Sequence, residues 1–224
     1  MIFSGFDTSA YPSDAVMKKW KAASPYSFCG YYIQSPCHGK SGWTGKRGVL
    51  VDMGWKLLPV YVGQQPAGAS RCRKNVLTAE QGKADGVDAA KRMEKEGFAE
   101  ASYVYLDIEH IDVFPASMGT YVSEWSAAVA RNGYSPAVYC HKQNAAEIRA
   151  AVAAGGGAAP PRFWIAGGSA DHFNIETSKP ADSGIAFADL WQCPEPVSRT
   201  FGGQTILIDE DVSTLADPSA AIPT

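Results

Sequence analysis

Short apolar runs rich in β-branched and aromatic residues recur along the chain. Most of them are followed by turn residues and then by a segment with helical periodicity. Each run has the length and composition of a β-strand. The pattern therefore predicts eight strands, at 1–7, 26–33, 56–63, 101–109, 135–141, 161–168, 187–193 and 204–211.

Helix signals lie between most of these strands. The segment 13–24 begins at Ser13, a residue type that favours the N-cap position, and 78–98 places Thr78 and Gln81 at the spacing of a capping box. Other helices are predicted within 44–55 (a short one), 115–134 and 142–157, and loops are predicted at 171–184 and 194–204.

Strands that alternate with helices are typical of an α/β protein with a parallel sheet. Such a sheet is either open and doubly wound or closed into a (β/α)8 barrel, and eight strand–helix units favour the barrel. Neither GxGxxG nor GxxxxGKS/T follows the first strand, so a dinucleotide or P-loop site has no support. We expect an α/β fold, a TIM-type barrel of parallel strands with some irregularity, forming one domain over residues 1–224.

Composition excludes several classes of partner. The 224 residues carry a net charge of −3, which predicts no basic surface for nucleic acid. No apolar run approaches the roughly 20 residues that a membrane span needs. The first residues, "MIFSGFDTSA", lack the basic and apolar regions of a signal peptide.

The five cysteines form no CxxC pair, so a structural zinc site is not expected. An odd number leaves at least one free thiol in a monomer. Cys37 and Cys72 lie in loop-like segments, and a disulfide between them would need an oxidising compartment. The sequence leaves that pairing open.

Acidic residues fall at the ends of three predicted strands. Asp7 ends the first strand, Asp107 and Glu109 end the fourth, and Asp209 and Asp211 end the eighth. Catalytic groups of a β/α barrel collect at the carboxyl ends of its strands. In a closed barrel the first and eighth strands are neighbours, so these acids would converge on one rim.

The fourth strand, "YVYLDIEH", places two carboxylates two residues apart. Because side chains alternate along a strand, Tyr105, Asp107 and Glu109 should share the face toward the barrel interior. Their Cα atoms would be about 6.6 Å apart at a rise of roughly 3.3 Å per residue. Two carboxylates this close in apolar surroundings cannot both ionise freely, so one pKa should rise. A proton donor beside an anion is the arrangement that glycosidases use.

Aromatic residues late in the strands favour a carbohydrate ligand, because aromatic faces stack on sugar rings. Gln192 is placed to hydrogen-bond a sugar hydroxyl or acetamide. The simpler interpretation is that each aromatic residue packs in the core. The six aromatic candidates are Tyr32, Tyr61, Tyr105, Tyr139, Trp164 and Trp191.

Structural roles compete for some of the acids. Asp7 and Asp211 are also placed to cap the segments that follow them. Asp107 and Glu109 have no comparable structural explanation, and a functional role is favoured for them. An acidic cluster can hold a divalent cation. These acids come from three strands without a supporting histidine, so neither a metal nor another cofactor is expected.

Taken in order, "GFDTSAYPS", "YLDIEH", "WIAGG", "LWQC" and "ILIDEDV" resemble the layout of glycoside hydrolase family 25 muramidases. The chain is more similar still to the glycoside-hydrolase-like family catalogued as domain of unknown function 1906. That family shares the "GFD" opening, a third strand like "YVGQQ" and a "YxDxE" fourth strand. The chain differs from the muramidases in "WIAGG", which has no aromatic residue after the alanine.

The resemblance implies a (β/α)8-type barrel and a lysozyme-like glycosidase. Family 25 enzymes cleave the β-1,4 bond after N-acetylmuramic acid, so bacterial cell-wall peptidoglycan is the implied substrate. The site residues that it implies are Glu109 as the acid, Asp107 and Asp7 as carboxylate partners, Asp209 or Asp211 in the lining, and Trp191 with Gln192 in the wall.

We therefore expect a monomeric glycoside hydrolase that acts on peptidoglycan. Two alternatives stay open: a non-catalytic cell-wall-binding module with a vestigial site, and a hydrolase of another cell-wall bond such as an amide of the peptide stem. Without a signal peptide, a cell-wall enzyme would reach its substrate by phage-type lysis or by signal-independent secretion, unless a signal has been removed.

Overall fold

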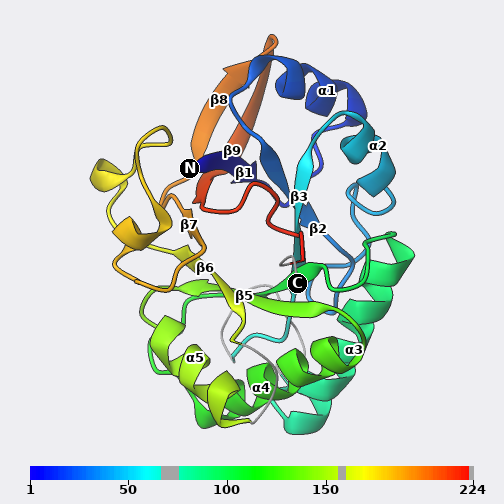
Figure 1. The fold of residues 1–224 in the computed structure, drawn as a ribbon, viewed down its shortest axis with the longest axis vertical. Helices are drawn as coiled ribbons and strands as arrows, with labels where there is room; N and C mark the ends of the chain where they lie inside the picture. Colours follow the sequence, from blue (N-terminus) through cyan, green and yellow to red (C-terminus); the bar gives the residue numbers. More distant parts are fainter. Residues whose placement is uncertain (67–75, 156–159, 222–224) are drawn as a thin grey trace.

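A closed ring of eight strands forms the centre of the fold in the computed structural model, which describes residues 1–66, 76–155 and 160–221 (Figure 1). Seven strands follow one another in chain order, each parallel to the next, and β9 pairs with both β7 and β1. The predicted barrel is confirmed. The ring consists of β1 (Phe3–Asp7), β2 (Phe28–Tyr32), β3 (Lys56–Val62), β4 (Tyr103–Ile108), β5 (Ser135–His141), β6 (Arg162–Ala166), β7 (Leu190–Gln192) and β9 (Gln204–Ser213).

The expectation that all strands are parallel is wrong for the last one. β9 runs antiparallel to β1 and to β7. Residues 194–204, predicted as a loop, contain β8 (Val197–Phe201), which forms a hairpin with β9 outside the ring. A parallel strand needs a long crossover, usually helical, to return the chain to the opposite end of the sheet. The described chain between β7 and β9 contains β8 and no helix that could carry it back to the opposite end of the barrel. β9 therefore enters the barrel at the rim where β7 ends.

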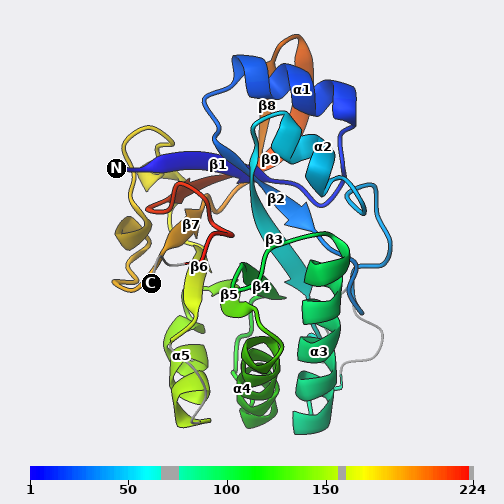
Figure 2. The same ribbon diagram turned by 45° about the vertical axis from the view of Figure 1, so that its right-hand side comes forward.

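Helices cover only part of the barrel wall, and they match the predicted positions (Figures 1 and 2). The predicted caps are confirmed: Ser13 accepts a hydrogen bond from the Val16 N–H, and Thr78 accepts one from the Gln81 N–H. Two short 3-10 helices, η1 (Ala170–His172) and η2 (Pro180–Ser183), lie between β6 and β7 in the stretch predicted as a loop. The α-helices are α1 (Asp14–Ala23), α2 (Arg47–Asp52), α3 (Ala79–Lys95), α4 (Ala116–Arg131) and α5 (Ala145–Ala154).

Two glycines on α3 allow close packing against α4. A Cβ atom on Gly82 would lie 2.3 Å from the Tyr121 carbonyl oxygen, and one on Gly86 would lie 2.5 Å from the Trp125 carbonyl oxygen. Both distances are too short for a real side chain. The small residues at this spacing therefore let the two helix backbones approach behind β3 and β4.

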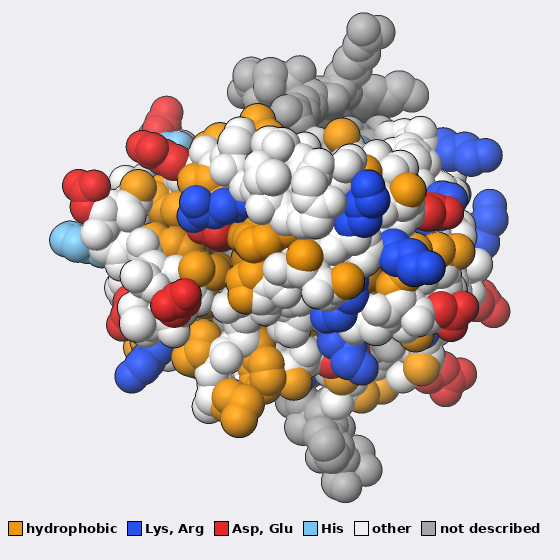
Figure 3. Space-filling model, turned by 90° about the horizontal axis from the view of Figure 1, so that it is seen from above, with side chains coloured by type: hydrophobic (Ala, Val, Ile, Leu, Met, Phe, Trp, Pro, Cys, Tyr) orange, Lys and Arg blue, Asp and Glu red, His pale blue; other side chains and the backbone are white. Residues whose placement is uncertain are grey.

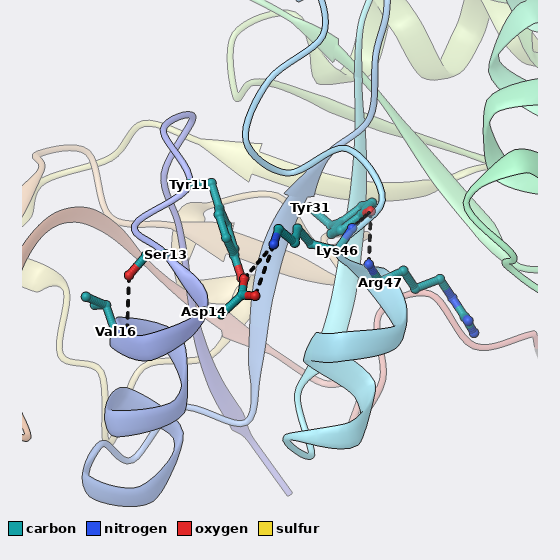
Figure 4. Close-up of polar contacts among 7 residues, drawn as sticks. All are labelled: Tyr11, Ser13, Asp14, Val16, Tyr31, Lys46 and Arg47. Carbon is teal, nitrogen blue, oxygen red and sulfur yellow. Dashed lines mark hydrogen bonds and ion pairs between the residues drawn. The ribbon is translucent and has the colours of Figure 1, made fainter.

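The beginnings of α1 and α2 are joined by a polar cluster (Figure 4). Asp14 accepts a hydrogen bond from the Tyr11 hydroxyl at 2.6 Å and forms an ion pair with Lys46 at 2.9 Å. These two contacts lower the pKa of Asp14, the Tyr11 hydrogen bond contributing most. The Arg47 N–H donates to the Tyr31 hydroxyl at 3.1 Å. The cluster links the segment after β1 to the segment after β2, both of which border the same rim.

The last described residues of the chain, drawn in red in Figure 1, lie across the opposite end of the barrel. The Pro218 carbonyl oxygen accepts hydrogen bonds from the Tyr105 hydroxyl and from Arg162, each at 3.0 Å. The Tyr103 N–H donates to the Ser219 carbonyl at 2.9 Å. This segment fills the end at which the parallel strands begin and leaves the other end for a site.

The surface has mixed charge on the side that carries α1 and the β8–β9 hairpin. Figure 3 shows Lys and Arg side chains interspersed there with Asp and Glu, with hydrophobic side chains between them. Among the described helices, none is both long and apolar enough to cross a membrane.

Candidate active site

A cavity of about 720 Å³ opens at the rim where the parallel strands end. Four carboxylates line it, and they come from β1, β4 with its following residue, and β9. The convergence that the sequence predicts is therefore present. The lining includes the acids Asp7, Asp107, Glu109 and Asp209, together with Tyr32, Gln65, Tyr139, Trp164, Gln192 and Leu207.

Asp7 is the last residue of β1, and its side chain is buried with 2% exposed. The neighbouring strand makes room for it with Gly30, where a Cβ atom would lie only 2.6 Å from the Cβ of Asp7. Any larger residue at position 30 would push against the carboxyl. The glycine in the middle of β2 is thus part of the site.

Neutral donors hold both oxygens of Asp7. The Tyr32 hydroxyl donates to one at 2.6 Å, and the Gln192 amide donates to the other at 2.7 Å. The amide oxygen of Gln192 in turn accepts from the Tyr139 hydroxyl at 2.7 Å. This chain of hydrogen bonds fixes the Gln192 amide and connects β1, β2, β5 and β7 across the cavity. Asp7 therefore interacts with the barrel wall instead of capping the segment that follows it.

Burial raises the pKa of Asp7 to about 7, and the charge of Asp209 adds to the effect. Asp209 lies directly opposite Asp7 in the register of β9 and β1, and burial raises its pKa as well. The hydrogen bonds from Tyr32 and Gln192 act in the opposite direction, because they stabilise the ionised form. The pair thus retains a proton at a pH at which exposed aspartates are ionised.

Asp211 lies beneath the cavity and is fully buried. One of its oxygens accepts a hydrogen bond from the Trp164 indole N–H at 2.8 Å, and the other has no hydrogen-bond partner among the described residues. Burial, and then the charge of Asp7, raise its pKa well above the ordinary value. β9 continues to Ser213, so the chain after Asp211 is strand and not the helical turn that the capping alternative required.

The end of β4 carries Asp107 and Glu109. Asp107 is 8% exposed and Glu109 is exposed at the cavity mouth. Gln65, at the end of β3, holds this segment: its amide group donates to the Asp107 carbonyl at 2.8 Å, and its amide oxygen accepts from the Glu109 N–H at 3.0 Å. Sequence reasoning missed this positioning role, although Gln65 belongs to the "YVGQQ" motif that follows the third strand.

Three of the six aromatic candidates do not line the cavity. Tyr61 points away from the interior and donates to Asp88 on α3 at 3.2 Å. Trp191 also points outward and donates to the Gly167 carbonyl at 2.8 Å. Tyr105 points inward but contacts the C-terminal segment at the opposite end. Strand alternation explains why Tyr61 and Trp191 face outward, because their neighbours Val62 and Gln192 are the residues of β3 and β7 that face the cavity.

The cysteines divide between the cavity and the core. Cys37 lines the cavity and is disulfide-bonded. Cys72, its candidate partner, lies outside the described residues. Cys29, Cys140 and Cys193 are free thiols in buried positions. Within the described part of the chain, no group of three or more His, Cys, Asp or Glu residues is arranged to hold a metal ion.

Solved structures with a similar fold include several proteins of low sequence identity. An uncharacterized protein of B. stearothermophilus is 16% identical, with a TM-score of 0.66 over 94% of this chain and 95% of that one. The bacterial lysozyme of Streptomyces coelicolor is 18% identical, with a TM-score of 0.59 over 95% of this chain and 92% of that one. The autolysin LytC of Streptococcus pneumoniae, in complex with a synthetic peptidoglycan ligand, is 11% identical, with a TM-score of 0.60 over 94% of this chain and 46% of that one.

These similarities concern the fold. No curated protein matches the chain by sequence. The sequence model of the Rv2525c-like, glycoside hydrolase-like domain matches residues 18–213, which include all but the first strand of the barrel. The chain therefore belongs to the Rv2525c-like family of glycoside hydrolase-like domains.

Proposed function

We propose that this protein hydrolyses a glycosidic bond of peptidoglycan. The observation that carries the proposal is the convergence of four carboxylates on one cavity that tyrosine and tryptophan side chains also line. Its volume of about 720 Å³ is within the range of small-ligand sites. Carboxylates and aromatic faces together suit a sugar, whose bond cleavage needs both a proton donor and stabilisation of positive charge.

Glu109 is the residue to which we assign the proton donor. Its exposed position at the cavity mouth leaves it free to reach the oxygen of the scissile bond. As the bond breaks, that oxygen takes the proton of Glu109, and the sugar ring develops positive charge at its anomeric carbon. Gln65 supports this step as a positioning residue, because it fixes the backbone N–H of Glu109.

Asp107 stabilises the cationic transition state from below, and Asp7 adds to this only where it is ionised, toward the upper end of the pH range, because its pKa is about 7. Asp107 is on the same face of β4 as Glu109, and Asp7 lies deeper, held by Tyr32 and Gln192. Carboxylates that the protein holds in a fixed orientation are more effective than carboxylates in solution, because they need no reorganisation as the charge develops. The nucleophile is a water molecule, or the acetamide group of the substrate, whose cyclic intermediate a water molecule then opens; in either case the proton lost by water passes to a carboxylate such as the Glu109 side chain that has given up its own.

Relatives in fold support peptidoglycan as the substrate. The LytC structure holds a synthetic peptidoglycan ligand, and the modular Cpl-1 endolysin, 14% identical with a TM-score of 0.56, is complexed with a peptidoglycan analogue. This chain has a similar fold, and its four acids line a cavity at the end of the barrel where β/α-barrel enzymes carry their active sites, which supports the proposal.

Digestion of purified murein tests the proposed bond. The wild-type protein should release soluble muropeptides with new reducing-end sugars, identified by mass spectrometry. Release of free stem peptides would instead identify an amide hydrolase. Binding to murein without any product between pH 4 and pH 8 would contradict catalysis and favour a glycan-binding module.

A further inference from the structure

A second cavity of about 350 Å³ adjoins the acidic one at the ends of β5 and β6. Both cavities are lined by Glu109, His110, Tyr139 and Gln192. The second cavity therefore lies directly beside Glu109, within reach of a substituent on a ligand bound in the acidic cavity. We call it the side cavity.

Two glycines shape the side cavity. Gly167 and Gly168 follow β6 with φ of +91° and +127°, conformations that favour glycine. A Cβ atom on Gly167 would lie 2.3 Å from the Nε2 atom of His141. The absence of a side chain lets the His141 ring lie against the backbone, with its centroid 4.4 Å from that of His110. The "AGG" segment of the sixth strand thus forms a wall lined by imidazoles.

Charge separates the two cavities. Four carboxylates and no described Lys or Arg line the acidic cavity, whereas the side cavity is lined by Lys142 and by one carboxylate, Glu109, which the two cavities share. The Lys142 N–H donates to the Ala166 carbonyl at 2.9 Å, which fixes the start of its side chain. Burial, followed by the charges of His110 and Lys142, lowers the pKa of His141. Lys142 is the Lys or Arg side chain that brings positive charge to the side cavity.

This separation selects a ligand with a neutral sugar and an acidic substituent. A carboxylate near Asp107 and Asp209 would be repelled, whereas one in the side cavity would lie in the field of the positively charged Lys142 side chain. We propose that the side cavity binds a carboxylate carried by the sugar next to the scissile bond. This inference rests on the proposed function, in which that sugar is N-acetylmuramic acid, whose lactyl group ends in a carboxylate or continues into a peptide.

Calorimetric titration with three disaccharides tests the inference without requiring turnover. The probes are chitobiose, which has no carboxylate, N-acetylglucosaminyl-N-acetylmuramic acid, and the same disaccharide with a dipeptide on the lactyl group. At low salt we expect the wild-type protein to bind the carboxylate-bearing probes about tenfold more tightly than chitobiose, as one charge-assisted hydrogen bond permits. If both carboxylate-bearing probes bind more tightly than chitobiose, the side cavity accepts either the lactyl carboxylate or a peptide carboxylate. If only the dipeptide probe binds more tightly, the group that is recognised is a peptide carboxylate.

Lys142→Met should reduce this tenfold ratio to about one. Lys91→Met, which removes an exposed lysine of α3, should leave the ratio at its wild-type value. Equal binding of all three probes by the wild-type protein, no binding of any probe, or a ratio that survives Lys142→Met would overturn the inference. Equal binding together with muropeptide release would overturn it alone and leave the proposed function standing.

Discussion

At the scale of single residues, Asp7 combines neutral hydrogen-bond donors with like-charged neighbours. Tyr32 and Gln192 hold its two oxygens, while Asp209 lies opposite it on β9. Sequence reasoning predicted a raised pKa on the fourth strand. The structure shows raised pKa values at Asp7, Asp209 and Asp211. The sequence could have predicted them, because the first and last strands of a closed barrel are neighbours and each of them ends in an acid.

Replacing Asp7 with Asn should change the pH dependence of stability. In the folded protein the pKa of Asp7 is about 7, whereas its ordinary value is 3.8. Between these values the folded state holds a proton that the unfolded state has lost, so wild-type stability falls as pH rises through this window and levels off above it. In urea unfolding from pH 4 to 8, Asp7→Asn should reduce that slope by up to about 1.4 kcal/mol per pH unit.

The same experiment gives the difference in free energy of unfolding between Asp7→Asn and the wild type at each pH. This difference should be more favourable to the variant at pH 8 than at pH 4, by an amount on the order of 2–4 kcal/mol. The matched control is Asp171→Asn, which alters an exposed aspartate of η1. A variant whose stability changes with pH as steeply as that of the wild type would show that Asp7 does not titrate in this window.

Tyr32→Phe should raise the pKa of Asp7 further. The substitution removes a hydroxyl that donates to the carboxylate at 2.6 Å, and the ionised form loses that stabilisation. A loss of about 1.5 kcal/mol corresponds to roughly one pKa unit. Carboxyl carbon NMR titration measures the change, with Tyr103→Phe at the other end of the barrel as control. An unchanged or lower pKa would mean that the hydroxyl does not stabilise the carboxylate.

At the scale of elements, the strands and helices were predictable, and the direction of the last strand could have been. The segment "VSRTFGGQTILI" reads as two strand-like runs around Gly202-Gly203, whose φ values of +56° and +71° suit a tight hairpin turn. Recognising that turn would have replaced the loop prediction with β8 and reversed β9. The proline residues before it, Pro194 and Pro196, favoured the loop interpretation.

Whether an individual aromatic side chain points into the barrel or out of it was less predictable. Every residue of β2 and of β4 is buried, because one face packs on helices and the other fills the barrel. The alternation of apolar and polar residues that normally identifies the inner face is then absent. Tyr61 and Trp191 were therefore assigned to the site although they face outward, whereas the two acids on one face of the fourth strand revealed the inner face of β4.

Gly30→Ala tests the contact between β2 and Asp7. The added methyl group would lie 2.6 Å from the Asp7 Cβ, so β1 and β2 must shift apart. We expect a destabilisation of about 1–3 kcal/mol, typical of overpacking, with loss of activity. Gly48→Ala is the matched control, since a Cβ there meets nothing within 4 Å on α2, and it should stabilise by about 0.5–1 kcal/mol. Chemical denaturation gives the change in free energy of unfolding for each variant, and an equal change in the two variants would contradict a close contact between Gly30 and Asp7.

At the scale of the whole molecule, closure of the barrel creates the site. β9 pairs with β1 and brings Asp209 opposite Asp7, while β4 supplies Asp107 and Glu109 from the other side of the cavity. The C-terminal segment fills the opposite end through Pro218 and Ser219. The described residues therefore form an acidic opening at the rim, which is the site to which we assign the proposed glycan.

We assign the hydrolysis of glycosidic bonds at this opening to Glu109 as the proton donor. The most direct measurement is the rate of reducing-end release from purified murein by wild type, Glu109→Gln and the control Glu100→Gln, which alters an exposed residue before β4. We predict that Glu109→Gln lowers kcat/KM by about 10²- to 10⁴-fold and that Glu100→Gln retains the wild-type value. Wild-type activity in Glu109→Gln, or no reducing ends from the wild type at any pH from about 4 to 8, would contradict the account.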